Sequence, residues 1–334
     1  MQSPSGGIQS AFLEHIKKNL PKNVSFADEL AEILAISRDS AYRRIRGETV
    51  LSLDEVQALT NHFKISLDAF LSPASDQVTF QLKAINQKDF SFEKWLISIL
   101  EYLDLFNSFK ETQKEIVFDS KDLPVFYYFQ FPRLAAFKIY FWKNSFSMET
   151  KVTSGKYDSS QVGKNLIALG EKIWERYSQI PSTEIIRYEM LIVTLRQIEY
   201  LYESGMFMDK QEAINLCDDC SLLATHLQHQ AKLGSKVTYG SNDPGAKVLM
   251  YLNDVLIGGN TILFRIGEKR IVFVTPNNFD ILRTDHLPFC QLTEEHTSNL
   301  INKSVLISGT AEKERNRFFN RIEERIREIK TRIT

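Results

Sequence analysis

The stretch from residue 26 to residue 71 constrains the fold of this chain more than any other. Its apolar residues come in short runs at helical spacing, and polar residues that favour helix ends separate these runs. Ser25 precedes a run over residues 26–34, and Asp28 stands three positions on as a capping-box partner. We therefore expect a short first helix here, which ends in a turn at residues 35–36.

Two further helices are predicted downstream of this turn. Ser37 is a good N-cap for a second helix, which ends at Gly47. Ser52 and Glu55 form an S-x-x-E capping box, in which each side chain bonds the other residue's backbone N–H, for a helix over residues 53–63. Two short helices joined by a tight turn, the second rich in arginine, are typical of a helix-turn-helix.

The second helix carries the side chains that we interpret as a DNA-binding surface. At 100° per residue, Ala41 and Ile45 share one face and are its only good core candidates, and Arg43 lies opposite them. An arginine can bond guanine through two hydrogen bonds or pair with phosphate. The alternative is a charged face that only contacts solvent. The candidate DNA-binding residues are Arg38, Asp39, Ser40, Tyr42, Arg43, Arg44 and Arg46.

This region resembles the lambda-repressor-like (Cro/repressor, XRE) helix-turn-helix regulators. The resemblance rests on LAEILAISRDSAYRRIRGE, the following SLDEVQALTNHF and the closing ISLDAF, and it covers about residues 8 to 72. It implies double-stranded DNA as the partner. One position departs from the family pattern, because Arg44 stands where the family usually has a second apolar residue, and Ile45 follows it. The family's base-reading positions fall on Arg38, Asp39, Tyr42 and Arg43.

Charge and composition limit how such a chain can bind DNA. The chain has 334 residues, of which 43% are hydrophobic and 25% charged, as in globular proteins of two or three domains. Its net charge of −1 excludes a generally basic coat, so DNA affinity must come from the cluster at residues 38–46. A homodimer would double this cluster, and we expect one.

The same composition favours a cytoplasmic protein without a membrane segment. The three cysteines form no disulfide framework, and residues 1–7 are polar, unlike a targeting segment. The most apolar region, residues 125–142, is interrupted by polar and charged residues. A bilayer-spanning helix would need about 20 mainly apolar residues.

We expect a multidomain chain with three parts. Residues 1–75 form an all-α helix-turn-helix DNA-binding domain, and SPASDQ at 72–77 is the linker that follows it. Residues 78–233 are predicted to be an all-α dimerisation or sensor region, either a bundle or an irregular tetratricopeptide-like array. Helical spacing of apolar residues recurs there over residues 92–103, 166–177, 185–201 and 210–232.

Residues 235–334 are predicted to form a small α/β or α+β domain. Residues 260–266 and 270–275 read as a β-hairpin with Gly267 in the turn. Further strands are expected at residues 247–257 and 305–308.

A terminal helix over residues 311–333 has a regular apolar stripe, for which we favour packing on its own domain over dimerisation or nucleic-acid binding. The stripe consists of Phe318, Ile322, Ile326, Ile329 and Ile333.

No catalytic or metal site is predicted. Cys217, Cys220, His226 and His229 have the types and spacings that zinc sites use, but they lie in one uninterrupted helical run. On that helix the cysteines and the histidines point in opposite directions, so we expect them to pack rather than bind metal. The aromatic stretch 126–146 is expected to be core rather than a ligand pocket. We therefore expect no enzyme and no cofactor.

The sequence predicts a sequence-specific DNA-binding transcriptional regulator. Its N-terminal domain would bind the operator, and the rest of the chain would dimerise or sense a signal, with a small molecule or a peptide as the effector. The alternative is a helical protein-interaction adaptor, in which the helix-turn-helix is only a packing module.

Overall fold

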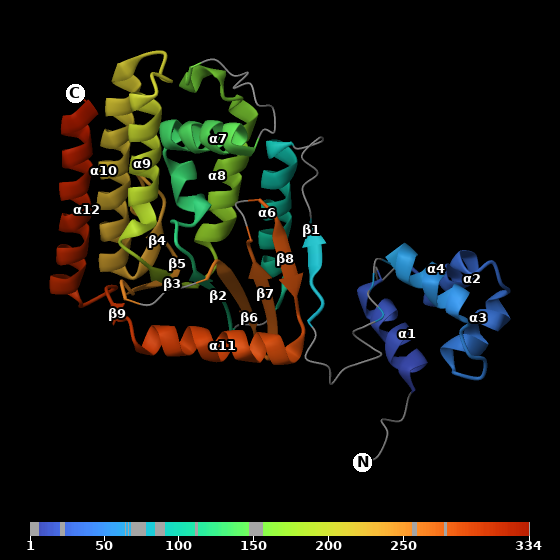
Figure 1. The fold of residues 1–334 in the computed structure, drawn as a ribbon. Helices are drawn as coiled ribbons and strands as arrows, with labels where there is room; N and C mark the ends of the chain where they lie inside the picture. Colours follow the sequence, from blue (N-terminus) through green and yellow to red (C-terminus); the bar gives the residue numbers. More distant parts are fainter. Residues whose placement is uncertain are drawn as a thin grey trace. The chain divides into compact units, whose positions relative to one another are not determined.

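The chain folds into two compact units, residues 1–79 and residues 80–334 (Figure 1). We treat each unit by itself. The computed structural model describes residues 7–20, 24–63, 65, 67, 78–83, 91–110, 113–146, 156–255, 259–276 and 279–333. The expected linker at 72–77 lies outside these residues.

The described part of the N-terminal unit holds four helices around a small core. Helices of eight residues, such as α2 and α3, are marginal in isolation, so their packing on one another must stabilise them. The fully buried core residues are Phe12, Leu13, Ile16, Leu30, Ala41 and Leu59. The helices are α1 (Ile8–Asn19), α2 (Phe26–Ile33), α3 (Arg38–Ile45) and α4 (Leu53–Phe63).

The helix starts follow the predicted capping pattern in two of three cases. Ser37 accepts a hydrogen bond from the N–H of Ser40 at 3.2 Å. Ser52 and Glu55 bond each other reciprocally, at 3.2 Å and 2.9 Å, as a capping box does. Ser25 is the N-cap residue of α2, as predicted, but its side chain accepts no hydrogen bond from this helix.

The described residues of the C-terminal unit form one mixed sheet of nine strands. The strand order is β1-β8-β7-β6-β2-β3-β5-β4, and β9 also pairs with β5. Strands β2, β3 and β5 run parallel, and all other pairs are antiparallel. The strands are β1 (Gln81–Lys83), β2 (Lys114–Asp119), β3 (Ser182–Ile186), β4 (Ser235–Val237), β5 (Pro244–Leu252), β6 (Thr261–Ile266), β7 (Lys269–Val274), β8 (Ile281–Thr284) and β9 (Val305–Leu306).

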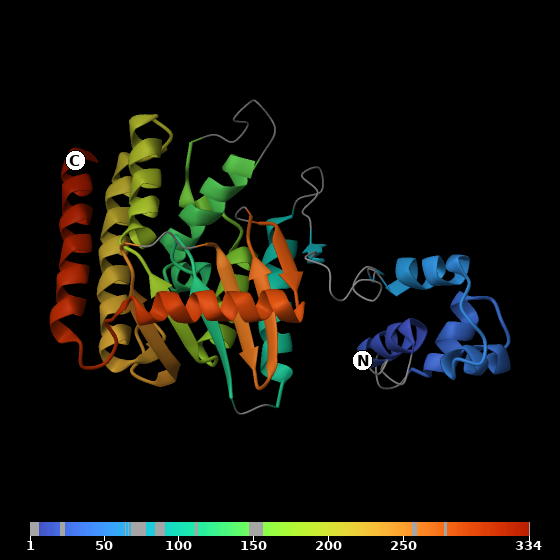
Figure 2. The same cartoon turned by 60° about the horizontal axis from the view of Figure 1, so that its bottom comes forward.

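Helices cover both faces of this sheet unequally. Helix α11 (Leu287–Asn302) crosses one face over β6 and β7, as Figure 2 shows. The other face packs against the main aromatic and aliphatic core, and α12 lies outside α9 and α10 (Figure 1). The elements on this side are α6 (Phe92–Ser108), η2 (Val125–Gln130), α7 (Pro132–Phe146), η3 (Ser159–Gln161), α8 (Lys164–Ser178), α9 (Glu189–Glu203), α10 (Lys210–Leu233) and α12 (Glu312–Ile333).

The predicted fold class is wrong for the larger part of the chain. Residues 78–233 are not an all-α region, because β1, β2 and β3 lie within them. Residues 235–334 are not a separate small domain, since β5 and β6 pair with β3 and β2 in one mixed sheet. Short apolar runs such as those in β2 and β3 cannot be told from helix segments by periodicity alone. For this reason, the single helical run predicted over residues 185–201 combined the end of β3 with α9.

Other local predictions are confirmed. Strands β6 and β7 form a hairpin, in which Ile266 pairs with Lys269 and Gly267 takes the positive φ of 53°. The apolar stripe of α12 is buried against α9 and α10, and most of residues 126–142 are buried in the core. The stripe of α12 that we considered for dimerisation therefore lies inside a single chain. Among the described residues, no helix has the length and apolar character to span a bilayer.

One buried cation stands out in this unit. Lys236 is completely buried, and its Nζ donates to the carbonyl oxygens of Tyr177, at 3.2 Å, and of Ile180. The same Nζ lies 3.6 Å from the centre of the Tyr177 ring. Burial lowers the pKa of Lys236 to about 7, and the nearby Glu184 carboxylate acts in the opposite direction.

This lysine should make stability depend on pH. An unfolded lysine has a pKa of about 10.4, so between pH 7 and 9 the unfolded chain binds more protons at this site. The free energy of unfolding should then rise with pH, by as much as about 1.4 kcal/mol per unit from this group. Urea denaturation of the full chain at several pH values measures the slope. Lys236→Met should remove this contribution, and equal slopes in the two proteins would contradict the assignment.

Candidate nucleic-acid interface

The turn between α2 and α3 is held by backbone hydrogen bonds. The N–H of Ile36 donates to the carbonyl of Ala31 at 3.0 Å, and the N–H of Ala35 donates to Glu32 at 3.2 Å. This pattern is a Schellman motif, which places its penultimate residue in the left-handed region. Ala35 has a φ of 51°, which costs an alanine about 1 kcal/mol and would suit glycine better. The turn fixes the direction in which α3 leaves α2.

Helix α3 packs on the face that the sequence predicted. Ala41 is fully buried, and Ile45 is partly buried against the same core. The opposite face lies in solvent, and five of the candidate DNA-binding residues are exposed along α3 and its C-cap. These exposed residues are Arg38, Asp39, Tyr42, Arg43 and Arg46.

Arg44 and Ser40 have structural roles instead. Arg44 donates to Glu55 through Nε at 3.2 Å and through Nη2 at 2.7 Å, and the two side chains are only 16% and 17% exposed. The hydrogen bond from Arg44 is the largest cause that lowers the pKa of Glu55. Ser40 is partly buried and shares a hydroxyl hydrogen bond with the N-cap residue Ser37. We therefore leave both residues out of the contact surface.

A glutamine from α1 also positions α3. The side-chain amide of Gln9 donates to the carbonyls of Arg44, at 2.9 Å, and Thr49, at 2.8 Å. Its oxygen accepts from the N–H of Leu51 at 2.9 Å. Gln9 thus ties α1 to the end of α3 and to the loop that follows. Sequence reasoning missed this residue, because its partners lie about 40 positions away and no local pattern marks it.

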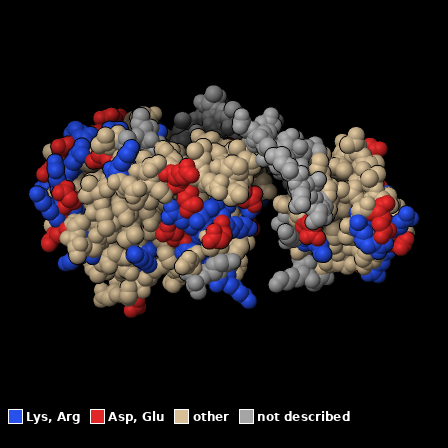
Figure 3. All heavy atoms as spheres, turned by 90° about the horizontal axis from the view of Figure 1, so that it is seen from below, with Lys and Arg blue, Asp and Glu red and all other residues tan. Residues whose placement is uncertain are grey.

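Each exposed arginine of α3 faces a carboxylate of its own chain. Arg38 lies 2.8 Å from Asp28, and Glu48 lies 2.6 Å from Arg46 and 3.8 Å from Arg43. The hydrogen bond from Arg46 is the main cause that lowers the pKa of Glu48. Figure 3 shows the same mixture of basic and acidic side chains on the visible face of this unit. Ion pairs this exposed contribute little, so the arginines can exchange them for phosphate oxygens.

Three of the four cysteine and histidine side chains singled out on α10 are buried. Helix α10 is continuous, and Cys217 and Cys220 are buried within it. Burial raises the pKa of Cys217 to about 12, so this thiol stays protonated near neutral pH. His226 bonds the carbonyl of Val237 at 2.9 Å, while His229 is exposed. Within the described ranges, no three His, Cys, Asp or Glu side chains gather as a metal site would require.

Comparison of the chain with protein-family models, with curated proteins and with solved structures found no match.

The ion pair between Arg44 and Glu55 should stabilise the N-terminal unit. We expect Arg44→Ala to destabilise helices α3 and α4 by about 1–3 kcal/mol, because it leaves the poorly exposed Glu55 carboxylate without its charged partner. Amide hydrogen exchange of α1–α4 in the full chain measures this loss. Arg38→Ala is the matched control, since its ion pair is exposed and should change stability little. Equal effects of the two substitutions would refute the structural role of Arg44.

Proposed function

We propose that this protein is a sequence-specific DNA-binding transcriptional regulator, and that α3 is the helix that enters the major groove. The observation that carries the proposal is the exposed face of α3, where three arginines stand on a capped helix whose other face is anchored by Ala41. A short helix fixed in this way, with its polar face free, is what a helix-turn-helix needs for base contact. The resemblance to the lambda-repressor-like family supports the same proposal.

The positions of the side chains on α3 suggest separate roles. Residues near the start and middle of a recognition helix contact base edges, so we assign Asp39, Tyr42 and Arg43 to base contact. Arg46 is the C-cap residue of α3 and is assigned to the phosphate backbone. Arg38 is the first residue of the helix, and we assign it to contact with a base edge or a phosphate.

Electrostatic attraction to DNA would be local rather than general. Residues 1–79 contain eight lysines and arginines and ten aspartates and glutamates, which gives a difference of −2. Binding must therefore replace carboxylates by phosphates at the arginines, and Glu48 competes with DNA for both Arg43 and Arg46. A small number of phosphate contacts predicts a shallow dependence of affinity on salt.

The protein-interaction adaptor remains the second candidate. Two apolar side chains beside α3, Val50 and Leu53, are largely exposed and would suit a protein partner. The homodimer also remains a prediction, and its interface would have to lie outside the buried stripe of α12. A DNA-binding assay separates the two candidates, because only the regulator needs the exposed arginines of α3 to bind DNA.

Two arginine substitutions should affect DNA binding in different ways. On a duplex selected from a random pool, Arg43→Ala should weaken binding by about 1–3 kcal/mol and relax discrimination at one base pair. Arg46→Ala should weaken all sequences alike and reduce the salt slope by about 1. Fluorescence anisotropy with matched and mutated duplexes measures both effects.

Arg176→Ala is the control for these variants, because it removes an equally exposed, ion-paired arginine from the C-terminal unit. Unchanged selectivity in a folded Arg43→Ala protein would remove the basis for this orientation of α3.

Removal of the competing carboxylate should strengthen DNA binding. Glu48→Gln frees Arg43 and Arg46 from their intramolecular partner and adds no positive group of its own. We expect tighter binding to every duplex and a steeper dependence of the affinity on salt. Anisotropy titrations at several salt concentrations test this. Asp104→Asn, which breaks the exposed pair with Arg176, is the control. Weaker or equal binding by Glu48→Gln would argue against a DNA surface at this end of α3.

A further inference from the structure

The outer face of α12 carries a row of three exposed basic side chains, which we call the α12 basic row. It consists of Lys313, Arg317 and Arg321. Residues four positions apart are neighbours on a helix, and at about 1.5 Å of rise per residue the row extends over about 12 Å. In Figure 3, basic side chains with some acidic ones among them gather at the left edge of the C-terminal unit, where α12 lies in Figure 1.

This arrangement is unfavourable for the helix itself. Like charges four residues apart repel each other and destabilise a helix. The row contains two such pairs, and Arg325 adds a third, because it follows Arg321 at the same interval. Glutamates at alternate positions of this line would stabilise a helix that only contacts solvent. An anion that contacts several of these side chains at once would relieve the repulsion.

Two members of the row have no carboxylate partner. Among the described residues, no Asp or Glu forms an ion pair with Lys313 or Arg317, although Arg321, Arg325, Lys330 and Arg332 of the same helix all have one. The exposed arginines of α3 differ in this respect, since each of them faces a carboxylate. An anion can therefore contact this part of α12 without displacing a carboxylate of the chain.

The third member of the row is held in place by an aromatic ring. The Arg321 guanidinium lies over the ring of Tyr188, with its Cζ 3.7 Å from the ring centre. Its nearest contact with Asp254 is 3.6 Å long, and the Arg321 side chain remains 58% exposed. A guanidinium stacked in this way keeps its N–H groups in a fixed plane, where they can bond a phosphate through two hydrogen bonds.

The chemistry of this surface favours a nucleic acid over a membrane or a protein partner. None of the large apolar side chains exposed among the described residues belongs to α12, whose apolar stripe is buried against α9 and α10. A helix that binds a membrane surface inserts an apolar face, and a protein interface has an apolar core. Each strand of duplex DNA carries one charge per about 3.4 Å of helix axis, so a single strand can contact the whole row.

We propose that the α12 basic row binds the phosphate backbone of duplex DNA without base recognition. This contact goes beyond base recognition by α3, because it lies in the C-terminal unit and is the same for every sequence. It would supply the nonspecific affinity that residues 1–79 lack, since their acidic residues outnumber their basic ones. A failure of base recognition by α3 would leave it standing, and the reverse is also true.

The double variant Lys313→Gln, Arg317→Gln tests the row in the full-length protein, with a fluorescent duplex of random sequence. It should weaken binding and reduce the slope of log affinity against log salt by about 1.8, because each lost phosphate contact reduces it by about 0.9. The double variant Lys172→Gln, Arg196→Gln removes the same charges from exposed positions of α8 and α9 and is the matched control. Arg317→Lys, which keeps the charge, should bind as the natural protein does.

The same titrations separate this contact from base recognition by α3. Arg43→Ala should change the discrimination between matched and mutated duplexes, whereas the α12 double variant should weaken binding to both alike. Three results would overturn the proposal: no binding of the natural protein to the random duplex, an unchanged salt slope in the α12 variant, or an equal loss in the control. Vesicles of phosphatidylserine and phosphatidylcholine decide against DNA if the α12 variant loses vesicle binding while its duplex binding is unchanged.

Discussion

The exposed surface of α3 depends on the ion pair between Arg44 and Glu55. This pair joins the last turn of α3 to the capping box of α4, so one carboxylate both caps a helix and fixes its neighbour. The buried Ala41 packs α3 on the core of the unit, and the turn at Ala35 sets the direction in which α3 begins. With its packing satisfied in this way, the helix can present Arg43 and its exposed neighbours without using them for stability.

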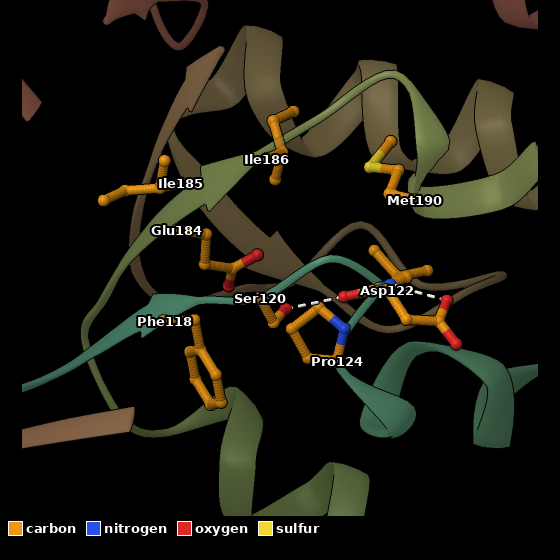
Figure 4. Close-up of a pocket in the computed structure, with 9 residues that line it drawn as sticks. Phe118, Ser120, Asp122, Pro124, Glu184, Ile185, Ile186 and Met190 are labelled. Atoms are coloured by element: carbon orange, nitrogen blue, oxygen red, sulfur yellow. Dashed lines mark hydrogen bonds between the residues drawn. The ribbon is translucent and has the colours of Figure 1, made fainter. Parts of the chain in front are cut away.

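The C-terminal unit buries polar side chains at the centre of its mixed sheet. Glu184 on the parallel strand β3 (Figure 4) accepts hydrogen bonds from three hydroxyl groups. The Lys236 ammonium lies over the ring of Tyr177, and its charge interacts with that of Glu184. Such groups are costly inside a core unless their partners are complete.

Patterns within a few residues were predictable, and pairings across the chain were not. The capping box at Ser52, the hairpin turn at Gly267 and the stripe of α12 follow from local rules and are present in the structure. Strands β2 and β3 were missed, because strands buried on both faces lose the alternation that marks a strand. Their partners also lie more than 60 residues away. The wheel placed Ala41 correctly, but only the structure shows that Arg44 has a partner eleven positions on.

Hydrogen exchange of the full-length protein with and without a selected DNA duplex tests whether α3 enters the major groove. DNA should slow exchange in peptides that cover residues 37–50, where α3 and its following loop lie, because groove contact reduces local opening of this helix. This protection should be lost in Arg43→Ala on the same duplex. Failure to select any duplex, or protection confined to other parts of the chain while residues 37–50 exchange as before, would contradict the account.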